Sequence, residues 1–367
     1  MTWIRKRSLV LWILIWAVAL MGCKGLRVGS GTEDKQAEGG DFAREHKKKV
    51  VTTVFPYYDF VRQIAGDHVE LTLVVPAGMD SHSFEPTPAD MRAIQNGDIL
   101  ICNGGSMEHW LTEVLDAIDT SHMEVVTMMD YVDVVEEELV EGMEEEAHDH
   151  FHGESDRHDE GYEPGAWGTR TKNVPAEGGP YVDDDGHHVE IEYDEHIWTS
   201  PINAIKLIGV IEKVLAEQDP AHAFWYKENA GILKMELERI DQGFRQVSES
   251  RRRNLIVVGD KFPFRYLAEE YGIDYRAAFS GCSTDTEPSA RTIAYLIDKV
   301  STDKIPVVYF LETGSQRVAR IIGEETGAKP LLLHSCHTVT RRQFEEGITY
   351  VELMEQNIEN LRKGLDE

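Results

Sequence analysis

Short apolar runs alternate with segments of helical spacing along most of this chain. Residues 50–54, 69–75, 99–102 and 125–128 are rich in apolar side chains, and a comparable series resumes at residue 255. Such alternation is typical of βα units, in which parallel strands form a sheet flanked by helices. In the second series the predicted strands are 255–258, 274–279, 307–311 and 331–334; the predicted helices of both series are 58–65, 88–96, 109–118, 264–271, 289–299, 316–326 and 350–365.

One long helix is predicted between the two series. Asp219 and Pro220 form a start signal, with Asp at the N-cap and Pro at the first helical position. Few helix-breaking residues occur from there to residue 250, and a helix of about thirty residues spans roughly 45 Å. The chain beyond residue 48 has a length that suits two domains. The helix is therefore long enough to run the length of a two-domain protein.

A strongly acidic segment separates the first series from the helical region. Residues 133–196 hold 22 Asp and Glu against 3 Lys and Arg, and the whole chain has a net charge of -29. We expect a mobile loop at 133–193, most ordered at its ends. It is either a solvated charge run or a weak metal trap. The overall charge argues against nucleic acid as a partner. Besides His196 the segment contains six histidines: His148, His150, His152, His158, His187 and His188.

The N-terminus has the features of an export signal. Three basic residues at 5–7 precede an apolar run that ends in Leu20-Met21-Gly22-Cys23. A basic start, a short apolar run and a small-residue cleavage site are typical of secretory signals. The ending resembles a bacterial lipobox, which implies a lipoprotein signal peptide at 1–23, lipid on Cys23 and a flexible tether at 24–48. A transmembrane anchor is the alternative, although the run is short for a span of about 20 residues.

Three further cysteines follow Cys23. Cys282 and Cys336 lie in similar turns and are candidates for a disulfide, since disulfides can persist outside the cytoplasm. Cys102 lies inside an apolar run and is expected to be a small buried residue. No CxxC motif is present, so a thiolate metal site is not expected.

Two short histidine motifs flank the acidic segment. The first is HSFEPTP at 82–88 and the second is DEHIWTSP at 194–201. In parallel α/β sheets, ligands bind beyond the carboxyl ends of the strands. His82, Asp260, Glu312 and His334 are expected at such positions, and His196 precedes the helical region. Neutral imidazoles are among the commonest ligands of Zn²⁺, so groups from both halves could meet around a transition metal.

These motifs together are similar to those of a known family. They resemble the metal-binding (cluster A-I) solute-binding proteins of bacterial ABC importers for zinc and manganese, in the TroA-like superfamily. The resemblance implies two α/β lobes, each with a mainly parallel sheet flanked by helices, joined by one long rigid helix, with a single metal between the lobes. The implied boundaries are 49–198, 199–252 for the helical region, and 253–367. Further segments that carry the resemblance are the lipobox, Asn103-Gly104-Gly105 with Glu108 and Trp110, and GCSTDTEPS at 281–289.

The resemblance also implies metal ligands. His82 and His196 match the two histidines that the family uses from its N-terminal lobe. The C-terminal lobe departs from the pattern, because 259–272 contains no histidine. Asp260 is the substitute there, and His334 takes the place of the family's final Asp, with His337 competing. Glu85 is kept out of the ligand set as a residue that orients a ligand or caps a helix, and Glu312 is expected to be structural.

The implied function is binding without catalysis. We expect a monomeric extracytoplasmic lipoprotein, anchored to the cell membrane, that captures Zn²⁺ and hands it to an ABC importer permease with modest domain closure. A manganese or iron receptor is the alternative, and it would favour a shell dominated by carboxylates. Two other classes are a metal-dependent hydrolase, disfavoured because HExxH is absent, and an adhesin-like surface lipoprotein, whose partner binding would not depend on metal.

Overall fold

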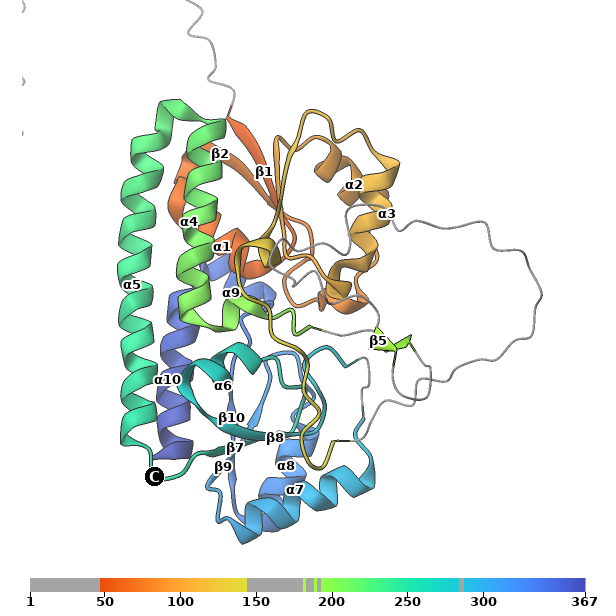
Figure 1. Cartoon of the computed structure of the whole chain (residues 1–367), viewed down its shortest axis with the longest axis vertical. Helices are drawn as coiled ribbons and strands as arrows, with labels where there is room; N and C mark the ends of the chain where they lie inside the picture. The colour runs from red at the N-terminus through yellow and green to blue at the C-terminus, as the bar shows by residue number, and fades with distance from the viewer. Residues whose placement is uncertain (1–46, 144–180, 183–187, 190–192, 284–286, 367) are drawn as a thin grey trace, which may run out of the picture. The chain divides into compact units, whose positions relative to one another are not determined.

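Two four-stranded parallel sheets organise the computed structural model, which describes residues 47–143, 181–182, 188–189, 193–283 and 287–366 (Figure 1). The sheet of the N-terminal lobe has the order β2-β1-β3-β4. Its strands are β1 (Lys48–Thr52), β2 (Val69–Leu73), β3 (Ile99–Cys102) and β4 (Glu124–Thr127), and its helices are α1 (Phe55–Ala65), α2 (Pro88–Gln95) and α3 (His109–Ala117). All four residues of β3 are buried, as expected for a central strand covered on both faces.

The C-terminal lobe repeats this arrangement with the order β10-β9-β7-β8. Every neighbouring pair of its strands is parallel. The predicted fold class of two α/β lobes is therefore confirmed. The strands are β7 (Leu255–Val258), β8 (Asp274–Ala277), β9 (Val307–Phe310) and β10 (Lys329–Leu332), and the helices are α6 (Arg265–Tyr271), α7 (Ala290–Thr302) and α8 (Arg317–Thr326).

Three long helices connect the two sheets. Helix α4 (Pro201–Gln218) begins where the Ser200 side chain accepts a hydrogen bond from the Asn203 N–H, and a short turn joins it to α5 (Ala223–Ser250). The buried residues of α5 recur every three or four positions from Tyr226 to Val247, so one face is apolar along its length. That face packs on α1 and α4, on α6 of the second lobe, and on α10 (Tyr350–Leu365) (Figure 1).

The predicted elements match the observed ones within a few residues, with two additions. Helix α9 (Arg341–Glu346) and the small antiparallel pair β5 (Tyr181–Val182) and β6 (His188–Val189) were not expected. The candidate disulfide is not formed, because Cys282 and Cys336 are both free. Cys336 is buried in the core, whereas the backbone N–H of Cys282 donates to Glu137 in a partly buried loop. Cys23, tether residues 24–46 and residues 144–180, 183–187 and 190–192 of the acidic segment lie outside the described residues.

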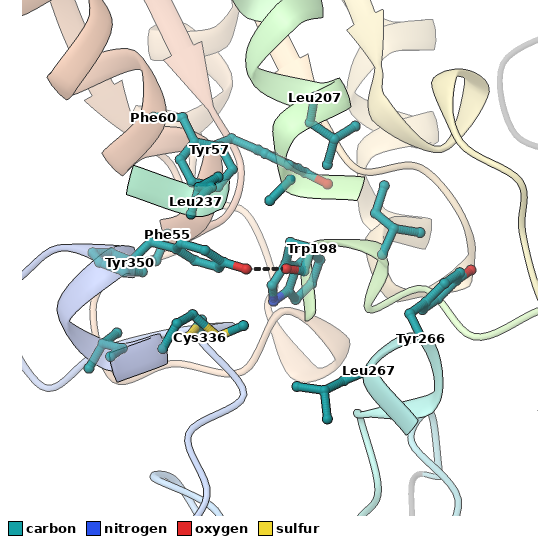
Figure 2. Close-up of a cluster of buried hydrophobic side chains, with 14 of the residues drawn as sticks. Phe55, Tyr57, Phe60, Trp198, Leu207, Leu237, Tyr266, Leu267, Cys336 and Tyr350 are labelled. Carbon is teal, nitrogen blue, oxygen red and sulfur yellow. Dashed lines mark hydrogen bonds between the residues drawn. The ribbon is translucent and has the colours of Figure 1, made fainter. Parts of the chain in front are cut away.

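Besides a separate hydrophobic cluster in each lobe, one larger core among the described residues extends through both lobes. It contains residues of β1 and β3 together with residues of β7 and β9, and the long helices lie between them. Trp198 is fully buried at its centre, and its carbonyl accepts a hydrogen bond of 2.5 Å from the Tyr350 hydroxyl (Figure 2). The Trp198 indole N–H donates to the Ser335 carbonyl at 2.9 Å. The segment after His196 is thus bonded directly to the loop after β10.

Candidate metal centre

Three imidazole rings face one another between the two lobes. The ring centres of His82, His196 and His337 form a nearly equilateral triangle, with separations of 6.0, 6.1 and 5.9 Å. All three residues line a cavity of about 400 Å³ whose walls come from both lobes. The structure therefore brings His82 and His196 together, as the sequence predicted, and adds His337 to them.

His82 lies in the turn that follows β2. The carboxylate of Asp80 accepts the backbone N–H of His82 at 3.0 Å, which fixes the short 3-10 turn that carries the ring. Nε2 of His82 is buried and has no hydrogen-bond partner. Burial is the main reason that the pKa of His82 is lowered to about 4, with His196 acting in the same direction. A neutral imidazole with an unused buried nitrogen is suited to bind a metal ion.

His196 is oriented by the residues beside it. Asp194 accepts a hydrogen bond from the backbone N–H of His196 at 2.7 Å and lies 3.2 Å from its Nδ1. Burial alone would lower the pKa of His196, but the carboxylates of Asp194, Glu137 and Glu195 together outweigh burial and raise it. A carboxylate on one ring nitrogen fixes the tautomer and leaves Nε2 for a metal.

The turn after β3 holds the segment that carries His196. The Glu195 carboxylate accepts hydrogen bonds from the backbone N–H groups of Ser106 and Met107, the latter at 2.6 Å. The Asn103 amide donates to the Glu195 carbonyl at 2.9 Å. Gly105 has φ +81°, and a Cβ at that position would overlap the Glu195 carboxylate. The Asn-Gly-Gly motif therefore holds Glu195, the residue next to His196, in a fixed position.

His337 comes from the loop after β10. Its Nε2 lies 2.7 Å from the Ser81 hydroxyl, beside His82, and its backbone N–H donates to the Ser335 hydroxyl at 3.2 Å. Burial is the main reason that the pKa of His337 is lowered to about 3, and His196 adds to this effect. His337 thus reaches across the cavity from the C-terminal lobe as a neutral imidazole.

Two carboxylates also line the cavity. Asp260 follows β7, and its Oδ1 accepts the Lys261 N–H at 2.9 Å. Burial raises the pKa of Asp260, and the glycine at 314 leaves room for its carboxylate, because a Cβ there would overlap it. Asp80 lies 3.8 Å from the Lys261 ammonium of the other lobe. Lys261 thereby partly balances the negative charge at the cavity.

His334 does not line the cavity, although its Nε2, like that of His82, is buried without a hydrogen-bond partner. The side-chain amide of Asn357 bonds both the backbone N–H and the carbonyl of His334, each at 2.7 Å. The His334 Nδ1 accepts the Cys336 N–H at 3.0 Å. Glu312 bonds the backbone N–H and the hydroxyl of Ser335, so it stabilises the same loop. Exposed Glu85 does not line the cavity either.

Both ends of the acidic segment lie against the C-terminal lobe. At its start, the Glu137 carboxylate accepts the Cys282 N–H at 2.9 Å, and Glu138 lies 3.4 Å from the Arg265 guanidinium. At its end, the Tyr266 hydroxyl donates to the Asp194 carbonyl at 2.6 Å. The segment therefore re-enters the described structure close to His196, whereas it leaves after Gly142 and Met143, where Gly142 lies against Tyr295 of α7.

No group of three or more His, Cys, Asp or Glu side chains within the described residues is already closed around a metal position. A tetrahedral zinc bound at about 2.0–2.1 Å by three imidazole nitrogens would place the ring centres about 5 Å apart. The observed separations exceed this by about 1 Å, so each ring needs an inward shift of roughly 0.5 Å. That shift is small enough for side-chain rotation and slight lobe closure.

Fold and site define a two-lobed solute-binding protein, with a histidine-lined cavity where parallel strands of both lobes end. Residues 50–364 match the family described as zinc-uptake complex component A, periplasmic, and the chain belongs to this family. The family resemblance inferred from the motifs is thus confirmed. The family consists of extracytoplasmic solute-binding receptors, so the expectation that the chain is not an enzyme is also confirmed.

Relatives and solved structures support this membership. The chain is 30% identical over 337 residues to the zinc-binding lipoprotein AdcA of Streptococcus pneumoniae, covering 92% of this chain and 58% of AdcA. It is 28% identical over 332 residues to the high-affinity zinc uptake system protein ZnuA of Bacillus subtilis, covering 90% and 92%. The crystal structure of the Zn(II)-bound ZnuA-like domain of S. pneumoniae AdcA gives a TM-score of 0.65 at 26% identity, with 88% and 100% covered. No helix among the described residues is long and apolar enough to cross a membrane.

Proposed function

We propose that this chain is an extracytoplasmic receptor that captures Zn²⁺ between its lobes and delivers it to the permease of an ABC importer. The observation that carries the proposal is the triangle of His82, His196 and His337 around one cavity. Relatives named for zinc binding and zinc uptake support the choice of metal. Lipid on Cys23 would hold the receptor at the membrane, as the lipobox implies.

The proposed ligands are the three imidazoles and a carboxylate. Nε2 of His82 is a buried nitrogen without a partner, and Nε2 of His196 is left available because Nδ1 faces Asp194. His337 keeps Nδ1 for the metal while Nε2 faces Ser81. The C-terminal lobe contributes Asp260 to the cavity wall. The proposal keeps three of the residues expected from the sequence and replaces His334 by His337.

The chemistry of this donor set favours zinc over manganese. Imidazole suits Zn²⁺, whereas Mn²⁺ prefers carboxylate, carbonyl and water oxygens. Three imidazoles with one carboxylate neutralise half of the charge of a divalent ion, and Asp80 lies close enough to interact electrostatically with His82 and His337. We therefore propose a tight zinc site and weaker binding of manganese.

The test is a calorimetric titration with zinc and with manganese. The protein is the chain from His46 onward, which contains the whole compact unit His46–Glu367. We expect one tight zinc site that is lost in His82→Ala and kept in His109→Ala, which removes an exposed histidine of the same lobe. The site should also survive deletion of residues 144–190. A tight site that persists in His82→Ala would refute the proposal, and tight manganese with weak zinc would support the manganese receptor instead.

A further inference from the structure

The tip of the hairpin formed by α4 and α5 carries exposed aromatic side chains. Phe224 is 77% exposed and Trp225 is 50% exposed, although both residue types are usually buried. Residues 220–226 contain no Asp, Glu, Lys or Arg, and Pro220 and Ala221 are exposed as well. We call Pro220, Ala221, Phe224 and Trp225 the hairpin-tip patch.

Two further exposed apolar side chains lie along the same helix. Ile232 and Met235, 53% and 60% exposed, follow Phe224 by eight and eleven residues. At 3.6 residues per turn, these positions fall on the same side of α5 as Phe224. Exposed Lys227 and Glu228 separate them from Phe224, so the hairpin-tip patch itself is the apolar surface. Exposed aromatic side chains gathered at one end of a molecule are typical of a surface that contacts another apolar phase.

The polypeptide enters the described structure beside the hairpin-tip patch. Lys48 of β1 pairs with Val69 of β2. The residue before Val69 is His68, whose ring lies 4.0 Å from that of His222 and 5.2 Å from that of Trp225. The start of β1 and the α4–α5 turn lie at the same end of the compact unit in Figure 1. Anything attached upstream of Lys48 is therefore tethered next to the patch.

From this placement we infer that the hairpin-tip patch inserts into the surface of the lipid bilayer to which the chain is anchored. The inference rests on the proposed lipid anchor at Cys23, which precedes Lys47 by 24 residues. A lipid at that distance keeps the patch within about 80 Å of the membrane, since an extended chain spans at most about 3.3–3.6 Å per residue. Tethering raises the effective concentration of bilayer at the patch, so a weak intrinsic affinity suffices.

Trp and other aromatic side chains are enriched at the membrane–water interface, which agrees with the composition of this patch. The charged residues around it are mixed, with exposed Lys47 and Lys227 and exposed Asp67, Glu70 and Glu228. Apolar burial rather than attraction to anionic lipid should therefore drive the contact. Insertion at this end would fix which side of the receptor faces the membrane.

The test measures the affinity of the patch itself, without the lipid. The chain from Lys24 onward is sedimented with phosphatidylcholine vesicles, next to the double variant Phe224→Ser/Trp225→Ser. The matched control is Leu139→Ser, which removes a side chain of 53% exposure that lies on the C-terminal lobe. We expect the parent chain and the control to partition equally, and the double variant at least about tenfold less.

Three outcomes would overturn the inference. The parent chain could fail to bind vesicles, the double variant could bind as well as the parent, or sedimentation velocity could show a dimer that the double variant abolishes, which would make a second copy the occupant. Zinc titration of the same samples reports the receptor function separately. All three proteins should bind zinc alike, so failure of the membrane inference is distinguishable from failure of the proposed function.

Discussion

Zinc affinity should depend on pH through one histidine of the site instead of three. Zinc binds neutral imidazole, so every ligand that is protonated in the free protein must first release a proton. The pKa values of His82 and His337 are lowered to about 4 and about 3, so both rings are already neutral at pH 5. Burial acts to lower the pKa of His196, but the Asp194, Glu137 and Glu195 carboxylates together raise it above its ordinary value of 6.5. Below that value, His196 is the only one of the three imidazoles at which protons compete with zinc.

The magnitude follows from counting displaced protons. One competing imidazole weakens binding about tenfold per pH unit, or about 1.4 kcal/mol. Between pH 6.5 and 4.5 the dissociation constant should therefore rise about 100-fold. Three imidazoles with ordinary pKa values would give a rise of roughly a hundred-thousand-fold over the same range. Affinity falls as pH falls in both cases, and the slope distinguishes them.

The assay is competition with a zinc chelator of known pH dependence, repeated across this pH range. A second measurement uses Asp194→Asn, which should lower the pKa of His196, flatten the slope and weaken binding about 10–100-fold at neutral pH. Asp219→Asn is the matched control, because Asp219 pairs with His222 at 2.7 Å outside the cavity. A slope near three in the parent chain, or an unchanged slope in Asp194→Asn, would refute the reasoning.

Three further predictions concern the residues that shape the site. His337→Ala should abolish the tight zinc site in calorimetry, whereas His334→Ala should keep it and lower the thermal midpoint; the reverse result would restore His334 as the ligand. Glu195→Gln should lower the free energy of unfolding by about 2 kcal/mol in a denaturant titration, because the Glu195 carboxylate accepts hydrogen bonds from buried backbone groups. An unfolding midpoint equal to that of the parent chain would show that these hydrogen bonds do not stabilise the fold. Gly314→Ala should weaken zinc binding by displacing Asp260; equal affinity would show that Asp260 is not a ligand.

The fold was predictable because its pattern is local. The strands of the two parallel sheets are short and mostly buried apolar runs, so their positions follow from hydrophobicity alone. The long helices follow from a start signal and a continuous apolar face. Helix α9 was missed because it is six residues long and none of them is buried. Its capping box, formed by Thr340 and Gln343, was the available signal.

The site was predictable only in part, because one backbone turn decides which histidine faces the cavity. His334 and His337 both follow β10, and their spacing does not distinguish them. Cys336 between them has φ +60°, a left-handed conformation that is uncommon for residues other than glycine. The chain there turns so that His334 is held by Asn357 while His337 lines the cavity. None of the residue types in Ser335-Cys336-His337 predicts a left-handed turn at this position.

The shared core has a consequence for how the protein unfolds. Proteins with two domains often melt in steps, because each domain has its own core. Here each lobe has a smaller cluster of its own, but the largest core spans both sheets, and Trp198 is bonded to the loop after β10 and to α10. Neither half can lose its packing without exposing apolar surface of the other, so the compact unit should melt in a single cooperative transition. Bound metal would then raise the melting temperature of the whole unit by mass action.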